Sequence, residues 1–312
     1  MKDKIISQFN VPEEIESFID KMLLIDEQKL ISKMEDKMYS KNDLKQLVSE
    51  LIDIDSENFI ASCYKRCILN KVIEENEVLY VLSDSYQRLG VFAQFEQDIW
   101  EGIDGDIRKR VDEWYVNEYA KKSIEKIEKG NDREQSNIEN AYFISLEEAL
   151  DLIDKKESSI YLLPCNCKTM AKNCNKPQNV CVQFETGINS MIDRGWGVKI
   201  SKDEAKELIR NANKSGLMHS SECESALCNC DACCCYPIRA SKILGMEKQW
   251  PKKIHEISWN KEKCISCGKC SKICNFGAFT IENKVVSFNN EKCWGCTICK
   301  DNCPTNAIKL KF

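Results

Sequence analysis

The residues best suited to chemistry are eight cysteines near the C-terminal end, which form two copies of one motif. Each copy has the spacing C-x2-C-x2-C-x3-C, and the second follows the first at an offset of 29 residues. Three thiolates at positions i, i+3 and i+6 can wrap around one four-iron cube, each on a different iron, while the fourth iron takes the last cysteine of the other copy. The spacing predicts two [4Fe–4S] clusters within residues 257–312, one on Cys264, Cys267, Cys270 and Cys303 and the other on Cys293, Cys296, Cys299 and Cys274.

This repeat resembles the bacterial-type two-cluster ferredoxins over residues 259–312, which implies a ferredoxin-like fold for this part. Cys303-Pro304 reproduces the Cys-Pro ending of that family. Cys274 is followed instead by Asn275, which leaves the ligands intact but can change the hydrogen bonding and the potential of its cluster. Gly268 and Gly295 ease the close approach of backbone N–H groups to the cluster sulfurs. A pair of zinc sites with four thiolates each, or free buried cysteines, are the alternatives.

Ten further cysteines lie between residues 165 and 235, in two groups with Cys223 between them. The first group is CNCKTMAKNCNKPQNVC and the second is CNCDACCC. Cysteines two residues apart on extended backbone point to the same face, so both can reach one metal centre. We expect metal ligands in both groups and one or two further iron–sulfur clusters within residues 160–236, with the ligands Cys165, Cys167, Cys174, Cys181, Cys228, Cys230, Cys233 and Cys235.

Alternatives stay open for this cysteine-rich block. One group can hold zinc instead of iron, or its cysteines can be unligated. Three consecutive cysteines do not easily all reach one cube, so Cys234 is the one we leave out. His219 is near the second group in the sequence, but a single histidine more often satisfies a local hydrogen bond than a metal.

Residues 160–312 resemble a widespread family of four-iron dicluster proteins of anaerobes. The resemblance rests on PCNCK, NCNKP, GLMH and CNCDACCC, which precede the ferredoxin repeat. Chains of that family place a comparable cysteine-rich module before a ferredoxin domain. The resemblance therefore implies a redox protein with additional clusters in an anaerobic setting, without implying a particular substrate.

The chain has 312 residues, including 20 cysteines, a length that suits two or three domains. Its beginning lacks the apolar core of a signal peptide, and no stretch approaches the roughly 18–20 apolar residues that span a bilayer. We therefore expect metal ligation in a reducing cytoplasm rather than disulfides. Residues 1–115 contain 25 acidic and 15 basic residues. This balance argues against nucleic acid as a partner, because phosphate contacts need clustered Lys and Arg.

Local signals predict an α+β protein with three domains at residues 1–128, 138–256 and 257–312, separated first by a polar linker at residues 129–137. In the first domain, Ser40 and Ser56 can each cap a helix, and the strand-prone run Glu77–Leu82 follows. Helix, helix and hairpin in this order predict a winged-helix-like domain. Cys63 and Cys67 share an apolar face of the second helix and are expected to pack in the core.

The elements that must position the other cysteines are short. Ser145 with Glu148 and Ser201 with Glu204 form capping boxes at two helix starts, and Gly216 suits a left-handed helix end. Together with strand-prone runs, these helices predict a small α/β unit around the central cysteines. In the ferredoxin repeat, residues 279–281 and 285–288 are expected to pair across Asn283 and Lys284.

The motif inventory favours electron transfer. The sequence has neither G-x-G-x-x-G nor a Walker A lysine motif, it lacks C-x2-C-H, and it has only two histidines. The main hypothesis is an iron–sulfur protein that passes low-potential electrons through its clusters to a redox partner protein, with no catalytic residues assigned. The second is a reductase in which an atypical central cluster binds a small substrate. The third is a redox-sensing regulator, which the acidic N-terminal region disfavours.

Overall fold

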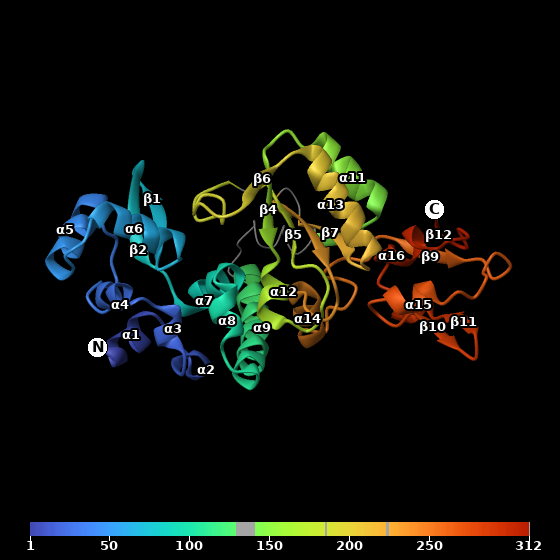
Figure 1. The fold of residues 1–312 in the computed structure, drawn as a ribbon, viewed down its shortest axis with the longest axis horizontal. Coiled ribbons are helices and arrows are strands. Elements are labelled where there is room, and N and C mark those ends of the chain that lie inside the picture. Colours follow the sequence, from blue (N-terminus) through green and yellow to red (C-terminus); the bar gives the residue numbers. More distant parts are fainter. Residues whose placement is uncertain (129–140, 185, 223–224, 312) are drawn as a thin grey trace. The chain divides into compact units, whose positions relative to one another are not determined.

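The computed structural model describes residues 1–128, 141–184, 186–222 and 225–311 (Figure 1). It mixes helices and strands in the manner of an α+β protein. The chain forms two compact units. The first contains Met1–Tyr115, Thr169–Ala171 and Thr186–Gly197, and the second contains Val116–Lys168, Lys172–Glu185 and Val198–Phe312. The linker predicted at residues 129–137 falls outside the described residues. Among the described helices, none combines the length and the apolar character needed to cross a membrane.

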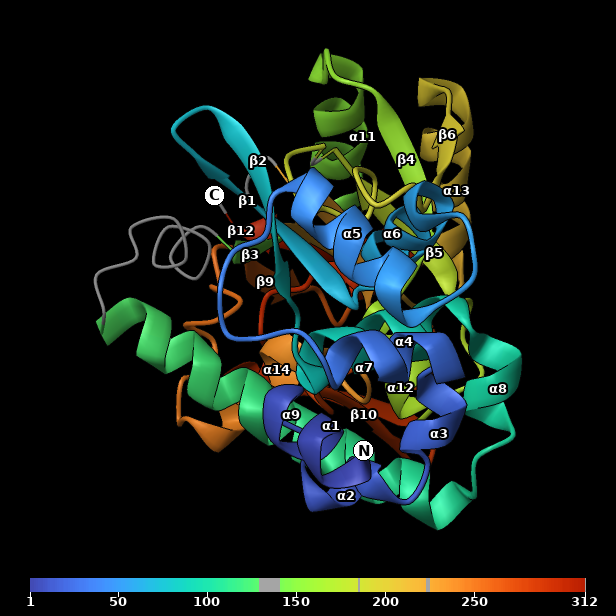
Figure 2. The same ribbon diagram turned by 90° about the vertical axis from the view of Figure 1, so that its left-hand side faces the viewer.

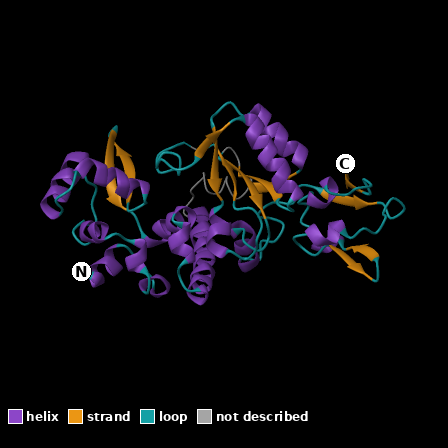
Figure 3. Cartoon of the chain, viewed as in Figure 1, coloured by secondary structure: helices purple, strands orange, loops and turns teal. Residues whose placement is uncertain are grey.

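The first unit is mainly helical and contains one antiparallel hairpin (Figure 3). Its elements are α1 (Lys2–Gln8), α2 (Glu13–Glu16), α3 (Ile19–Met22), α4 (Ile25–Ile31), α5 (Lys41–Leu51), α6 (Ser56–Lys65), β1 (Leu69–Glu74), β2 (Glu77–Leu82), α7 (Ser85–Phe95) and α8 (Gln97–Glu101). The long helix α9 (Gly105–Glu128) begins in this unit, and its later residues belong to the second.

The two capped helices predicted in this unit are α5 and α6. The Ser40 side chain accepts a hydrogen bond from the backbone N–H of Asp43, as an N-cap should. At α6 the cap is Asp55 rather than Ser56, because the Asp55 carboxylate accepts the N–H of Asn58 at 2.7 Å. The second predicted cap is therefore wrong by one residue.

The strand predicted at Glu77–Leu82 is β2, with the same bounds. It pairs with β1 across Glu75 and Asn76, whose φ values are 48° and 66° (Figure 2). Positive φ at both positions gives a two-residue turn whose twist matches that of the strands. The element order α5, α6, β1, β2 is the predicted one, and the winged-helix assignment itself stays a prediction.

A loop from the middle of the chain completes the first unit. Within this loop, Arg194 is buried and donates to the carbonyl oxygens of Tyr64 at 2.5 Å and Leu69 at 3.0 Å. The Trp196 ring stacks on Phe95 with ring centroids 4.2 Å apart. Arg194 thus binds the end of α6 and the start of β1, and Trp196 packs on α7, although both lie about a hundred or more positions away in the chain.

The second unit contains a six-stranded sheet with the order β3-β7-β8-β5-β4-β6. Its strands are β3 (Ala141–Ile144), β4 (Ile160–Pro164), β5 (Asn179–Gln183), β6 (Val198–Ile200), β7 (Met218–Glu222) and β8 (Ala226–Cys230), and its helices are α11 (Leu146–Lys155), α13 (Lys202–Lys214) and α14 (Tyr236–Ile243). Helix α12 (Asn166–Ala171) begins in this unit, and its last three residues belong to the first. All the pairings between these strands are antiparallel. The α/β unit predicted for this region is thus corrected to an antiparallel α+β arrangement, because its helices do not connect parallel neighbours.

Helices α11 and α13 begin at the two predicted capping boxes and pack together beside the sheet (Figure 1). Ala149 and Ile153 of α11 and Ala205 and Ile209 of α13 share one apolar core with strand residues such as Val182. Gly216 follows α13 with a φ of +79°, as the left-handed helix end requires.

The last part of the second unit carries the cysteine repeat on short elements. They are β9 (Glu256–Trp259), α15 (Lys269–Ile273), β10 (Phe279–Glu282), β11 (Val285–Phe288), the 3-10 turn η1 (Asn290–Lys292), α16 (Ile298–Asp301) and β12 (Ile308–Lys311). Strand β10 pairs with β11 across Asn283 and Lys284, which confirms the predicted hairpin, and β9 pairs with β12.

The repeat extends to the backbone conformation. Three pairs of positions, each separated by the same 29 residues, all have positive φ: Ser266 and Gly295, Gly268 and Thr297, and Gly277 and Asn306. Because an L residue adopts this conformation only at a cost, its recurrence shows that the two cysteine loops follow the same path.

Candidate metal centres

The first predicted ferredoxin-type site lies around one cavity. This cavity is lined by all four expected ligands, Cys264, Cys267, Cys270 and Cys303, together with neighbours that include Gly268 and Pro304. Cys267 is exposed and Ile265 beside it is 65% exposed. The loop that holds this site therefore meets solvent.

The second predicted site is more buried. Cys293, Cys296 and Cys299 are each less than 10% exposed. Burial raises the pKa of each of these thiols. Cys274 packs against the apolar core that contains Cys293 and Cys299, so the last cysteine of the first copy lies beside cysteines of the second.

Backbone N–H groups point at these sulfurs. Gly295 donates to the Cys293 Sγ at 3.4 Å, and Ala278 donates to the Cys274 Sγ at 3.2 Å. Burial raises the pKa of Cys303, but hydrogen bonds from Thr305 and from the N–H groups of Ala307 and Ile308 outweigh this and lower it overall. Such N–H groups stabilise negative charge on the cysteine sulfurs, as a bound cluster would require.

Both places fit a [4Fe–4S] cluster. Each offers four thiols, N–H donors near the sulfurs and, at the first, a cavity between the ligands. A bound cluster would supply one-electron redox chemistry there. The assignment of individual cysteines to clusters stays a prediction.

The central cysteines divide differently from the sequence groups. Cys230 and Cys235 share one apolar core, and Cys228 packs against it. Neighbouring thiols shift the pKa of one another: Cys167 raises the pKa of Cys165, and Cys167 and Cys230 raise that of Cys235. A charge on Cys181 also raises the pKa of Cys165. Members of both sequence groups therefore meet in one place, which we call the central thiol group, made of Cys165, Cys167, Cys228, Cys230 and Cys235.

Short elements position the central thiol group. Cys165 precedes α12 directly after β4, Cys167 lies in the first turn of α12, and Cys235 precedes α14, so two helix starts position three thiols. Cys228 and Cys230 lie two residues apart on β8, as expected for ligands on the same face. The N–H of Tyr236 donates to the Cys167 Sγ at 3.4 Å.

A second central cluster of side chains consists of Cys174, Asp231, Cys233 and Cys234. Their ligand atoms all lie within 4.8 Å of one another. Cys234, which the sequence does not predict as a ligand, is part of it, and so is Asp231. The position of Asp231 inside CNCDACCC is a signal in the sequence for this role, because Asp can bind zinc beside cysteines.

Other predicted residues have local roles. The His219 ring is 1% exposed and meets Asn229 Oδ1 at 2.7 Å and Asn213 Nδ2 at 3.2 Å, so both of its nitrogens have protein partners. Cys63 and Cys67 are buried, as expected for core residues. Helix α6, however, ends at Lys65, and Cys67 follows it with a φ of 61°, so the two thiols do not share a helix face. Cys223 lies outside the described residues.

One apolar core connects the central thiol group with the second ferredoxin-type site. It contains Cys230 and Cys235 from the former, Cys296 from the latter, and Trp294. The Trp294 ring stacks on Phe276 with centroids 4.6 Å apart. The two groups of thiols are therefore separated by packed side chains rather than by solvent.

Asn275, the departure from the Cys-Pro ending, lies at the same junction. Its Oδ1 accepts hydrogen bonds from the N–H of Ala232 at 3.3 Å and from Lys176 Nζ at 3.4 Å. Its Nδ2 donates to the Gly216 carbonyl at 3.4 Å. The residue that replaces proline thus ties the ferredoxin-type repeat to the loops of the central cysteines.

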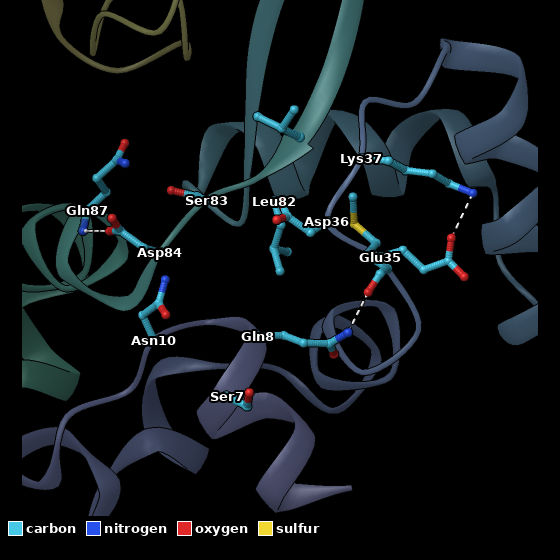
Figure 4. A pocket seen from close by; sticks show the side chains of 12 residues that line it. Ser7, Gln8, Asn10, Glu35, Asp36, Lys37, Leu82, Ser83, Asp84 and Gln87 are labelled. Atoms are coloured by element: carbon cyan, nitrogen blue, oxygen red, sulfur yellow. Dashed lines mark hydrogen bonds and ion pairs between the residues drawn. The ribbon is translucent and has the colours of Figure 1, made fainter.

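A polar pocket of about 470 Å³ lies in the first unit (Figure 4). Its lining side chains bond mainly to local partners. Gln8 donates to the Met34 carbonyl at 2.6 Å, Lys37 pairs with Glu35 at 2.9 Å, and Asp84 caps α7. These contacts explain the polar residues by local structure, and we assign the pocket no chemistry.

Comparison with known proteins agrees with the C-terminal geometry. Residues 258–310 match the family model described as a 4Fe-4S dicluster domain. No curated protein and no solved structure matches the chain. The match supports a ferredoxin-type iron–sulfur domain at this end and, in general terms, an iron–sulfur electron-transfer role.

Proposed function

We propose that this protein is an electron carrier in which the two ferredoxin-type clusters exchange low-potential electrons with a further cluster on the central thiol group. The observation that carries the proposal is the shared apolar core of Cys296, Trp294, Cys230 and Cys235. Closely packed side chains between two redox centres exclude water, and they hold the centres closer together than a solvent-filled gap would. The chain's own residues have two tasks here: they hold the ligands, and they set the surroundings of the sulfurs.

The exposed loop of Cys267 and Ile265 is the proposed entry point for electrons. A redox partner protein can approach this loop closely, since both side chains meet solvent. The cluster of Cys274, Cys293, Cys296 and Cys299 then relays the electron inward. In this proposal residues 257–312 form the relay, residues 138–256 form the receiving module, and residues 1–128 contact a second protein, the oxidoreductase that uses the electrons.

A reductase is the second candidate. The central thiol group contains five cysteines, one more than the four ligands of an ordinary cube. An additional thiol can support a cluster of unusual structure with an iron open to a small substrate. Addition of cyanide to the reduced protein tests this candidate, because only a cluster with an open iron site changes its EPR spectrum.

The test of the carrier proposal is a redox titration of the anaerobically purified full chain, followed by EPR and combined with iron and sulfide analysis. We expect about twelve irons, eight for the ferredoxin-type repeat and four for the central group, and fully reversible reduction. Cys230→Ser should remove about four irons and leave the ferredoxin-type signals in place. About eight irons in the unaltered chain, or irreversible reduction by low-potential donors, would contradict the proposal.

A further inference from the structure

Four side chains beside the central thiol group meet at one point. The Sγ atoms of Cys174 and Cys234 are 3.9 Å apart, and those of Cys233 and Cys234 are 3.7 Å apart. The Asp231 carboxylate accepts hydrogen bonds from the thiols of Cys174 at 3.3 Å and Cys233 at 2.8 Å. The three thiols and this carboxylate therefore converge on the same small volume.

The sulfur spacing distinguishes one ion from a cluster. With zinc–sulfur bonds of about 2.3 Å, the sulfurs of a tetrahedral site lie about 3.8 Å apart. The two observed separations agree with this edge length. Thiolates around a four-iron cube are considerably farther apart, because each binds a different iron atom.

Surrounding contacts fix the orientation of the Asp231 carboxylate. Asp231 is 1% exposed and forms an ion pair with Lys168, which is 2% exposed. Its Oδ1 also accepts the N–H groups of Cys233 at 3.2 Å and Cys234 at 3.0 Å. Outer contacts of this kind fix the orientation of a metal-binding carboxylate, and the Lys168 ammonium offsets part of the negative charge that three thiolates would add.

We propose that Cys174, Asp231, Cys233 and Cys234 bind one zinc ion, in a site separate from the central thiol group. Three thiolates and one carboxylate are a donor set that zinc accepts in tetrahedral geometry. The ion would join the loop after α12 to the loop between β8 and α14, where Asn173 Nδ2 already donates to the Cys233 carbonyl at 2.8 Å. The inference does not depend on electron transfer, so each proposal can fail without the other.

The experiment measures zinc and iron together in the full chain, purified anaerobically with both metals supplied. We expect about one zinc per chain and, at the zinc absorption edge, about three sulfurs near 2.3 Å with one oxygen. Cys234→Ser should lower zinc retention against a chelator at least tenfold and leave iron unchanged. Cys230→Ser is the matched control, a change in the central thiol group, and should lose iron while it keeps zinc.

A second substitution tests the carboxylate. Asp231→Asn should also weaken zinc retention about tenfold or more, and cobalt supplied in place of zinc should give the intense visible bands of a tetrahedral thiolate site in the unaltered chain. Loss of iron rather than zinc in Cys234→Ser would overturn the proposal and assign these residues to a cluster. An unaltered chain that takes up neither zinc nor cobalt would overturn it as well.

Discussion

Gly295 occupies a position where almost any side chain would collide with the backbone. Its φ is +68°, and a Cβ atom there would lie 2.4 Å from the carbonyl oxygen of His255. The same loop directs the Gly295 N–H at the Cys293 sulfur. The glycine therefore permits both the turn and the close packing of β9's leading segment against the second ferredoxin-type site.

Gly295→Ala should destabilise the ferredoxin-type repeat by more than backbone strain alone. Gly277→Ala is the matched control, since Gly277 has a φ of +65° but open space around it. We expect roughly 1–2 kcal/mol for Gly277→Ala from strain, and a further 1–3 kcal/mol for Gly295→Ala from the collision. Chemical denaturation followed by cluster absorbance measures both. Equal losses in the two variants would show that the loop shifts without cost.

Sequence spacing allows a definite prediction for the eight C-terminal cysteines because each local motif contains three expected ligands of one cluster, and the residues that contain them match a 4Fe-4S dicluster family model. Spacing alone does not predict which of the central cysteines lie together. Cys165 and Cys167 directly follow β4, and Cys230 ends β8, more than sixty positions later; β5 lies between these two strands in the sheet and so brings their ends to the same region. Spacing within one segment carries no information about which distant segment lies beside it.

At the scale of elements, the turn between α15 and β10 has two roles. It carries Cys274, and through Asn275 it contacts the loops of the central cysteines. Cys274 has a φ of −69° and a ψ of 110°, which is a conformation compatible with a following proline. The local backbone therefore does not require an asparagine at this position. The hydrogen bonds of its side chain to Ala232 and Lys176 are the role that a proline could not perform.

Asn275→Pro should retain the ferredoxin-type clusters and loosen their junction with the central module. The side chain loses its hydrogen bonds to Ala232 and Lys176, worth about 1 kcal/mol each. We expect hydrogen exchange at the Ala232 amide to become about five to ten times faster, with unchanged iron content. Asn275→Ala should behave alike if the side chain is responsible. Slow exchange at Ala232 in both variants would contradict this role.

The loop Thr186–Gly197 is the other element with a role beyond its neighbours. Arg194→Ala leaves the carbonyl oxygens of Tyr64 and Leu69 without their buried donor. We expect a loss of roughly 3 kcal/mol in the free energy of unfolding of the first unit. Arg110→Ala, at an exposed position on α9, should change it by less than about 0.5 kcal/mol. Urea denaturation followed by tryptophan fluorescence compares them, and similar values would refute the role of Arg194.

Local rules predict most of the short elements, and they fail where distant segments decide. Ser40, Ser145 and Ser201 cap helices as expected because an N-cap is a contact within four residues. The antiparallel order of the six-stranded sheet and the contribution of Thr186–Gly197 to the first unit depend on long-range packing. Neither leaves a periodic pattern in the sequence.

At the scale of the whole molecule, the two units differ in their dependence on metal. All the described cysteines of the second unit except Cys181 belong to its candidate metal centres, whereas the first unit contains Cys63 and Cys67 in an ordinary apolar core. The first unit buries large side chains such as Trp100, Phe92 and Phe9 without any ligand. We therefore expect the units to respond differently when metal is withdrawn.

Anaerobic removal of iron and zinc with a chelator should unfold the C-terminal repeat and spare the first unit. Amides of β9 and β12 should exchange at least about ten times faster, because metal binding and folding are coupled in small cysteine-rich domains. Amides of β1 and β2 should keep their protection and serve as the internal control. Hydrogen exchange with mass spectrometry gives both readings, and a uniform loss of protection would show that the first unit also depends on metal.

The first unit is built from segments that lie far apart in the chain, so its folding depends on the order in which they are synthesised. Its core includes Thr186–Gly197, which the ribosome adds long after Tyr115. While residues 116–185 are being synthesised, the carbonyl oxygens of Tyr64 and Leu69 lack the hydrogen bonds that Arg194 donates in the folded unit. The N-terminal helices therefore complete their packing only after Gly197 has left the exit tunnel, when the first four central cysteines, Cys165 to Cys181, have already emerged.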